Sequence, residues 1–327
     1  MGAPVQGHSR NAKMDFHQGG LSLDHRIIQT GCHPDGLPLQ KKRGGVMAMD
    51  ALIASFGLIN LFALGGVVLI GLPHGAFDGA IAACLGQADQ PFTLIRFITL
   101  YVVLAGLVVG LWLLFPVAVL IGFLGISIIH FGLGDARAKS GWLRYVQAIA
   151  HGGVVVAGIS QGHRLEVDVI FGYLVGGDAA PVWMAIDIAS VIIAVTLAIY
   201  AWQAFWNARW RLGFLEAGLL ILLFAAVQPL FGFALYFCCV HSARHIWSVW
   251  TAVKLEFPSQ MLFGGAMAFT LASWGAGAAA FWWCASFMAV ESALLRVVFI
   301  GLAALTVPHM ILVDGFFRSN VGNSQRG

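Results

Sequence analysis

Residues 97–134 read FITLYVVLAGLVVGLWLLFPVAVLIGFLGISIIHFGLG, and this stretch contains no Asp, Glu, Lys or Arg. About 20 consecutive apolar residues are enough for a helix to cross the hydrocarbon core of a bilayer. The stretch is long enough to hold most of two crossings, and Phe115-Pro116 is the natural joint because proline interrupts a helix. The sequence therefore predicts two adjacent transmembrane helices, 92–114 and 116–134.

The whole chain has the same character. Of its 327 residues, 59% are hydrophobic and 10% are charged, and the mean hydropathy is +0.85. Soluble domains are about 45–50% apolar and about 25% charged. This composition excludes nucleic-acid-binding proteins and disordered chains. The five cysteines form no CxxC pair, which argues against a disulfide framework or a zinc site. A multi-pass membrane protein remains.

Apolar segments of spanning length predict an all-α fold, a polytopic transmembrane helical bundle of eight to ten spans. Four of the candidates are short, which sets the lower limit. The ten candidates are 50–70, 72–88, 92–114, 116–134, 145–160, 182–205, 212–234, 235–252, 260–283 and 293–317.

The first 46 residues differ from this body. They hold six basic and three acidic side chains and so account for the whole formal net charge of +3. They lack the apolar centre of a signal peptide. We expect residues 1–46 to be a polar, disordered leader or sequence upstream of a natural start at Met47 or Met49. Residues 47–327 are expected to form a single transmembrane domain.

Basic residues predict the orientation, because they are enriched in cytoplasmic loops. Lys41, Lys42 and Arg43 place the N-terminus in the cytoplasm of a protein of the inner or plasma membrane. With ten spans, the loops that hold most of the other basic residues fall on the same side. These residues are Arg137, Lys139, Arg144, Arg209, Arg211 and Lys254.

Histidines within the apolar spans are the informative feature. An ionisable side chain at membrane depth is costly and usually serves a function, and neutral imidazole is the commonest metal ligand in proteins. One such histidine could simply bond to a carbonyl group, but six in one chain favour a metal site. The six are His74, His130, His151, His241, His245 and His309.

The strongest local pattern is the pair His241 and His245 in HSARH. Residues four apart share a helix face, with Cβ atoms about 5–6 Å apart, so both imidazoles can reach one metal ion. The glutamate of an HExxH zinc hydrolase is missing. The pair therefore predicts metal ligands without a neighbouring general base.

His74 lies between Pro73 and Gly75, where we expect a helix to begin or break. Asp78 follows one turn later. Its carboxylate either accepts a ring N–H and orients an imidazole, or caps the N-terminus of a helix.

The other histidines differ in their surroundings. His130 stands in an apolar helix with only Ser127 as a polar neighbour, so its partner must come from another helix, as expected of a ligand. His309 follows Pro308 and is a further candidate. His151, beside Gly152, is the one that most resembles a structural histidine. Three or four imidazoles without a thiolate suit iron, copper or zinc, and the many aromatic residues favour an apolar ligand cavity and oxygen chemistry.

Four motifs carry a family resemblance: GLPHGAFD at 71–78, IIHFGLGD at 128–135, HSARH at 241–245 and VPHMILVD at 307–314. From about residue 50 onward the chain resembles the Brp/Blh family, bacterial and archaeal membrane β-carotene 15,15′-dioxygenases. The resemblance implies that O₂ cleaves β-carotene at its central double bond to give two molecules of all-trans-retinal. It also implies contact with the lipid bilayer, hand-over of retinal to a rhodopsin, and no nucleic-acid partner.

The resemblance further implies a non-haem Fe(II) cofactor. By motif, its ligands would be His74, His130, His241 and His245, with Asp78 as an essential neighbour in the catalytic domain 47–327. His309 and His151 are additional candidates. With ten spans His74 lies near the outer face and His130 near the cytoplasmic face. Since one metal needs ligands at one depth, we expect a bend at 71–88 or one span fewer.

Two other classes of protein have similar features. Histidine-rich membrane desaturases and related di-iron oxygenases carry HxxHH boxes as well as HxxxH, and this chain has one HxxxH and no HxxHH. A metal or proton transporter would be expected to show midplane carboxylates and related halves, whereas Asp187, Glu216 and Glu291 lie near span ends. A bis-histidine haem protein would be distinguished by its visible absorption.

Overall fold

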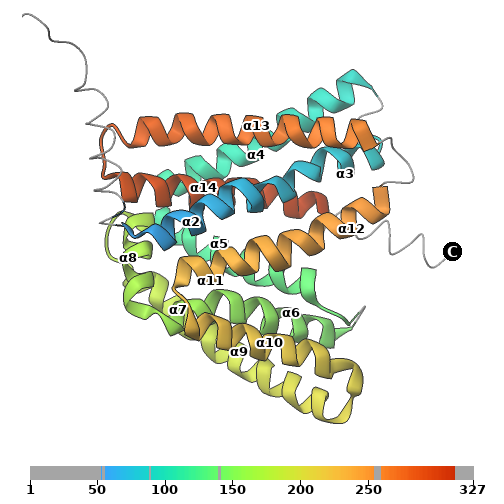
Figure 1. Cartoon of the computed structure of the whole chain (residues 1–327), viewed down its shortest axis with the longest axis vertical. Coiled ribbons are helices and arrows are strands. Elements are labelled where there is room, and N and C mark those ends of the chain that lie inside the picture. The colour runs from blue at the N-terminus through green and yellow to red at the C-terminus, as the bar shows by residue number, and fades with distance from the viewer. Residues whose placement is uncertain (1–52, 54–55, 88–89, 139–140, 254–258, 314–327) are drawn as a thin grey trace, which may run out of the picture. The chain divides into compact units, whose positions relative to one another are not determined.

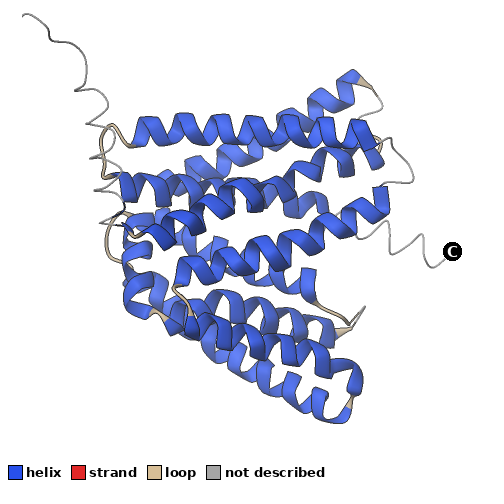
Figure 2. Ribbon diagram, viewed as in Figure 1, coloured by secondary structure: helices blue, strands red, loops and turns tan. Residues whose placement is uncertain are grey.

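The computed structural model describes residues 53, 56–87, 90–138, 141–253 and 259–313. These residues form helices and their connections and contain no β-strand (Figure 2). Contacts separate Met1–Gly45 from Val46–Gly327, and every described residue belongs to the second unit. The expected leader 1–46 and the starts at Met47 and Met49 lie outside the described residues.

The helices are joined by short connections (Figure 1). In chain order they are α2 (Leu58–Gly66), η1 (Val67–Gly71), η2 (Leu72–Phe77), α3 (Asp78–Cys84), α4 (Pro91–Leu114), α5 (Pro116–Asp135), α6 (Trp142–Gly153), η3 (Val154–Gly158), α7 (Ile159–Gly162), α8 (Arg164–Val175), α9 (Ala180–Trp206), α10 (Ala208–Ala226), α11 (Pro229–Leu235), η4 (Tyr236–Ser242), α12 (Ala243–Val253), α13 (Ser259–Cys284) and α14 (Val290–Met310). Here η1, η3 and η4 are π-helical and η2 is a 3₁₀-helix.

Five of the described helices are long and apolar enough to cross a membrane. They are Leu58–Ala83, Pro91–Leu114, Pro116–Asp135, Ala180–Trp206 and Val290–Val313. Large apolar side chains cover their outer faces, such as Phe62 at 69% and Leu113 at 70% exposed. The all-helical membrane fold is confirmed, and the total of eight to ten spans stays a prediction.

The spans expected at 50–70 and 72–88 are a single helix in the structure. From Leu58 to Cys84 the chain runs through α2, η1, η2 and α3 without leaving helical geometry. The predicted break at Pro73 is therefore wrong. The helix instead widens into a π-turn and then tightens into a 3₁₀-turn, which is how a helix accommodates a residue without an N–H.

Two other expected boundaries also moved. The joint expected near Leu235 lies at Val227-Gln228, which are extended because Pro229 excludes helical geometry from the residue before it. Pro229 then begins a helix that continues through η4 to Val253. The connection between the expected spans 145–160 and 182–205 contains helix α8, so the chain between α7 and α9 is itself largely helical.

The merged first helix places the histidines at one depth. α2–α3 and α5 both run toward the right side of Figure 1, as does α14 (Figure 1). His74 and His130 therefore both lie in the half of their helix that approaches the right side, and so does His309. With ten spans, His74 and His130 were expected near opposite faces of the membrane. Because the expected spans 50–70 and 72–88 are one helix, this conflict disappears.

Helices α5 and α6 approach each other most closely at glycines. A Cβ at Gly132 would overlap the backbone carbonyl of Ala148, and one at Gly152 would overlap that of Ile128. Neither carbonyl can move without displacing its helix. The approach holds α5, which carries His130, against α6.

We therefore expect Gly132→Ala to lower the thermal stability of the detergent-solubilised protein, by about 1–3 kcal/mol as in other overpacked cores. The matched control is Gly125→Ala on the same helix, where a Cβ meets nothing within 4 Å. It should stabilise the helix by about 0.5–1 kcal/mol. Equal melting temperatures for the two variants would show that the close approach is unimportant.

Candidate metal centre

Four histidines from three helical segments meet in the interior. His130 comes from α5, His241 and His245 from the continuous η4–α12 helix, and His309 from α14. Ring centroids are 4.9 Å apart for His130–His241, 5.3 Å for His130–His309 and 4.9 Å for His245–His309. All four residues are between 3% and 8% exposed. We call these four residues the histidine cluster.

Local packing fixes the rings. Phe131 and Phe237 contact the His241 ring at 4.8 Å and 5.9 Å between centroids, and the Phe237 ring is stacked on it. His241 itself lies in the π-helical segment η4. A π-turn adds a residue to the helix and rotates the residues after it, and such turns are frequent at functional sites.

Asp78 is completely buried and binds two side chains. Its Oδ1 lies 2.7 Å from Nδ1 of His309, and its Oδ2 accepts a hydrogen bond of 2.9 Å from the hydroxyl of Tyr101. Since a carboxylate only accepts, the first contact favours a proton on Nδ1 and a lone pair on Nε2 of His309. Of the two roles expected for Asp78, the geometry supports the orientation of an imidazole, and no side-chain cap is formed at this helix start.

The donor set fits a transition metal. Asp78, His245 and His309 each offer a ligand atom, and these three atoms lie within 4.8 Å of one another. Nitrogen ligands with one carboxylate suit iron, copper or zinc.

The predicted ligands are placed as follows. His130, His241 and His245 lie together, and His309, ranked lower from sequence, lies between His130 and His245. The side chain of His74 lies outside the described residues, although its segment η2 packs against α12 and α14. His151 instead has its Nε2 3.8 Å from Asp135.

A second group of polar residues adjoins the cluster and was missed from sequence. The buried carboxylate of Asp135 binds Arg244 at 2.7 Å and the Tyr236 hydroxyl at 2.7 Å. Arg244 also pairs with Glu216, which binds Arg137 at 3.0 Å. These four ionic residues are the carboxylate network. Two features of the sequence could have indicated this group: Arg244 lies inside the HSARH motif, and Asp135 lies at the end of an apolar helix.

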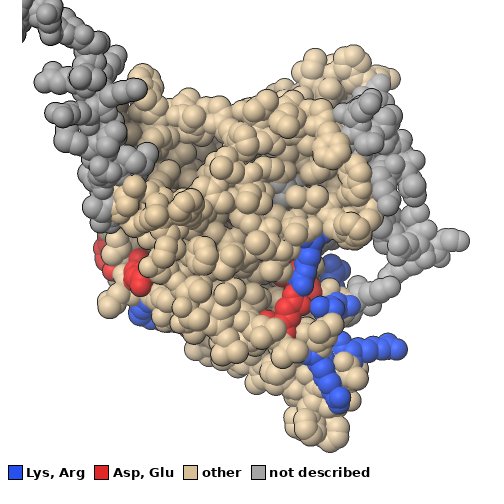
Figure 3. Space-filling model, in the orientation of Figure 1, with Lys and Arg blue, Asp and Glu red and all other residues tan. Residues whose placement is uncertain are grey.

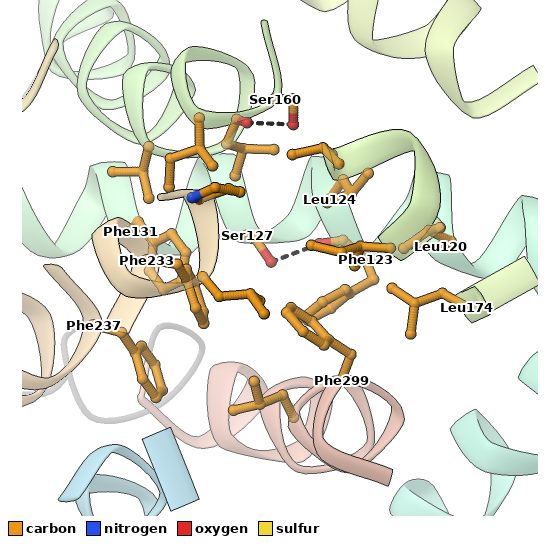
Figure 4. A pocket seen from close by; sticks show the side chains of 18 of the residues that line it. Leu120, Phe123, Leu124, Ser127, Phe131, Ser160, Leu174, Phe233, Phe237 and Phe299 are labelled. Carbon is orange, nitrogen blue, oxygen red and sulfur yellow. Dashed lines mark hydrogen bonds between the residues drawn. The ribbon is translucent and has the colours of Figure 1, made fainter. Parts of the chain in front are cut away.

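Two cavities reach the histidine cluster from different directions. The front cavity has a volume of about 910 Å³ with its opening, and His130 and His241 lie at its edge. Apart from Ser127, Ser160 and Thr306, its other lining is apolar, and Figure 4 shows Phe123, Phe233 and Phe299 gathered around it. The hydroxyls of Ser127 and Ser160 donate to carbonyls of their own helices (Figure 4), so they leave the cavity apolar.

The rear cavity includes His309 in its lining. A third, polar cavity lies between the cluster and the carboxylate network and is lined by His245, Asp135 and Arg244. The cluster thus separates apolar space from a charged end of the bundle, where Figure 3 shows basic and acidic side chains together.

Comparison with known proteins identifies relatives of the chain. A family model described as beta-carotene 15,15'-dioxygenase matches residues 65–317. The chain is 37% identical to "Beta-carotene 15,15'-dioxygenase" of uncultured marine bacterium 66A03, over 80% of this chain and 95% of that protein. It is 29% identical to "Probable beta-carotene 15,15'-dioxygenase Blh" of Halobacterium salinarum, over 55% of this chain and 58% of that protein. No solved structure matches.

The carboxylate network predicts a stability effect. Arg244→Ala removes the cation that binds the buried Asp135, and hydrogen bonds to charged groups contribute about 1.5–3 kcal/mol. We expect a lower melting temperature and partial recovery in the double variant Arg244→Ala/Asp135→Asn, which removes the buried charge as well. Arg209→Ala, at an exposed position, serves as the control. Additive effects of the two substitutions would contradict the pairing.

Proposed function

The chain belongs to the β-carotene 15,15′-dioxygenase family, and we propose that its histidine cluster is the iron centre at which β-carotene is cleaved. The activity of the family is the conversion of the carotene to retinal. The observation that supports the proposed location is the meeting of four buried imidazoles with Asp78 at the edge of an apolar cavity.

The overall reaction needs no further reductant. The central C=C bond and the O–O bond break, and two C=O bonds form, so one O₂ supplies the oxygen of both aldehydes. When bound, Fe(II) supplies the redox chemistry that allows O₂ to react with a hydrocarbon. The protein residues hold the iron, orient the polyene and exclude water.

We propose that imidazoles of His130, His241, His245 and His309 hold the iron. Through its contact with Asp78, His309 would present Nε2. His74, implied as a ligand by the family motif, remains a predicted ligand. His151 is proposed to stay with Asp135. In this proposal His309 is an iron ligand, whereas from sequence it was only an additional candidate.

The residues around the cluster position the ligands and the substrate. Phe131 and Phe237 hold the His241 ring from two sides. The apolar front cavity accepts a hydrocarbon chain without displacing polar partners. No acid or base is required at the reacting carbons. Orientation of the polyene toward the cluster therefore supplies the protein's main contribution to the rate.

In the cell we propose that the protein spans the inner or plasma membrane, takes β-carotene from the bilayer and passes retinal to a rhodopsin. Arg137, Arg144 and Arg209 lie at the right side of Figure 1, where α5 meets α6 and α9 meets α10. The enrichment of basic residues in cytoplasmic loops assigns this side to the cytoplasm. This orientation puts Leu58 at the outer end of its helix. The cytoplasmic N-terminus expected from Lys41, Lys42 and Arg43 stays a prediction, because these residues lie outside the described part of the chain.

Substitution of a ligand tests the proposal. His241→Ala should abolish retinal formation from β-carotene and lower the iron content measured after purification. His163→Ala is the matched control, since that imidazole binds the Phe224 carbonyl at 2.7 Å, away from the cluster. Full activity with stoichiometric iron in His241→Ala would refute the proposed centre.

Asp78 is expected to act through His309. Asp78→Ala should fold and lose about 10–100-fold in iron affinity or turnover, as is usual when the partner of a ligand is removed. Asp78→Asn keeps an oxygen that can accept from Nδ1 and should recover part of this loss. Tyr101→Phe leaves the carboxylate in place and should have the smallest effect. Unchanged iron content and rate in Asp78→Ala would leave Asp78 with a structural role only.

A further inference from the structure

Cleavage at the centre of a long symmetric molecule requires room for one half on each side of the reacting group. The front cavity does not offer this by itself. It follows one face of α5 from Leu120 to His130, a distance of about 15 Å at 1.5 Å per residue. The histidines lie at one end of this length, so the front cavity extends away from the cluster in one direction.

The rear cavity meets the histidine cluster at a different residue, His309. It contains His309 and continues between Leu72 of η2 and the α13 residues Thr270 and Ser273. Leu302 and Thr306, one turn apart on α14, line both cavities. The front and rear cavities are therefore neighbours that share these two side chains, which we call the Leu302–Thr306 ridge.

Taking the proposed function as its basis, we infer that the front and rear cavities are the two arms of one binding site for a long conjugated hydrocarbon. The central bond lies at the histidine cluster, and one half of the molecule occupies each arm across the Leu302–Thr306 ridge. A conjugated chain is stiff and cannot fold back into a single arm.

The two arms together then measure the substrate. Each half must fit its arm for the central bond to reach the cluster, so narrowing one arm should exclude a full-length half and still admit a shortened one. Ser160 lines the front arm and Ser273 the rear arm. The same substitution, Ser→Phe, can therefore be made in each arm. Neither serine belongs to the histidine cluster.

The experiment compares two substrates. One is β-carotene, and the other is a β-apocarotenal that keeps one complete half and lacks the end ring of the other. Ser160→Phe and Ser273→Phe should each reduce retinal formation from β-carotene by about tenfold or more and retain turnover of the apocarotenal. The double variant should lose both substrates, because the complete half then has no open arm. Ala272→Phe, an exposed neighbour on α13, should cleave both like the unmodified protein.

Iron content and melting temperature of each variant show whether it folds. Cleavage of β-carotene by Ser273→Phe at the rate of Ala272→Phe would overturn the inference, as would equal loss of both substrates in either single variant. These readings depend on substrate length and not on which residues hold the iron. A failure of the proposed iron centre would instead appear as retained iron and activity in His241→Ala.

Discussion

The contact between Asp78 and His309 joins the first long helix of the described chain to the last. A buried carboxylate is costly unless it is paired and hydrogen-bonded, and Asp78 has no exposed surface at all. Its two partners, His309 and Tyr101, come from α14 and α4. The apolar bundle between these helices must therefore close in one arrangement for Asp78 to be satisfied, and that arrangement brings His309 against His130 and His245.

Irregular turns make this arrangement possible in helices that are otherwise regular. A π-turn precedes His74, another contains His241, and π-helical residues follow His309. Each such turn changes which residues face the interior from that point onward. An uninterrupted α-helix through 229–253 would keep a single apolar face. Within η4, Phe237 stacks on His241 and both residues are buried.

The sequence predicted the parts of this fold that depend on apolar length and on proline at a helix start, such as the joint at Phe115-Pro116. It failed where proline lies within a helix, because Pro73 was expected to break a helix that a change of winding preserves. The partners of buried polar residues could not be predicted from local pattern, since nothing near Tyr101 in sequence points to Asp78. Such pairs depend on contacts between distant helices, whereas the spacing of the two HSARH histidines depends on helix periodicity alone.

Selectivity for one bond of a polyene is a matter of position. The double bonds of a conjugated chain resemble one another chemically, so the protein must select among them by placement. The histidine cluster lies where the front and rear cavities approach each other, and the carboxylate network lies on its third side, where an apolar chain gains nothing. In the inferred two-arm site a hydrocarbon is thereby confined to the front and rear cavities, and the lengths of these cavities decide which carbons reach the cluster.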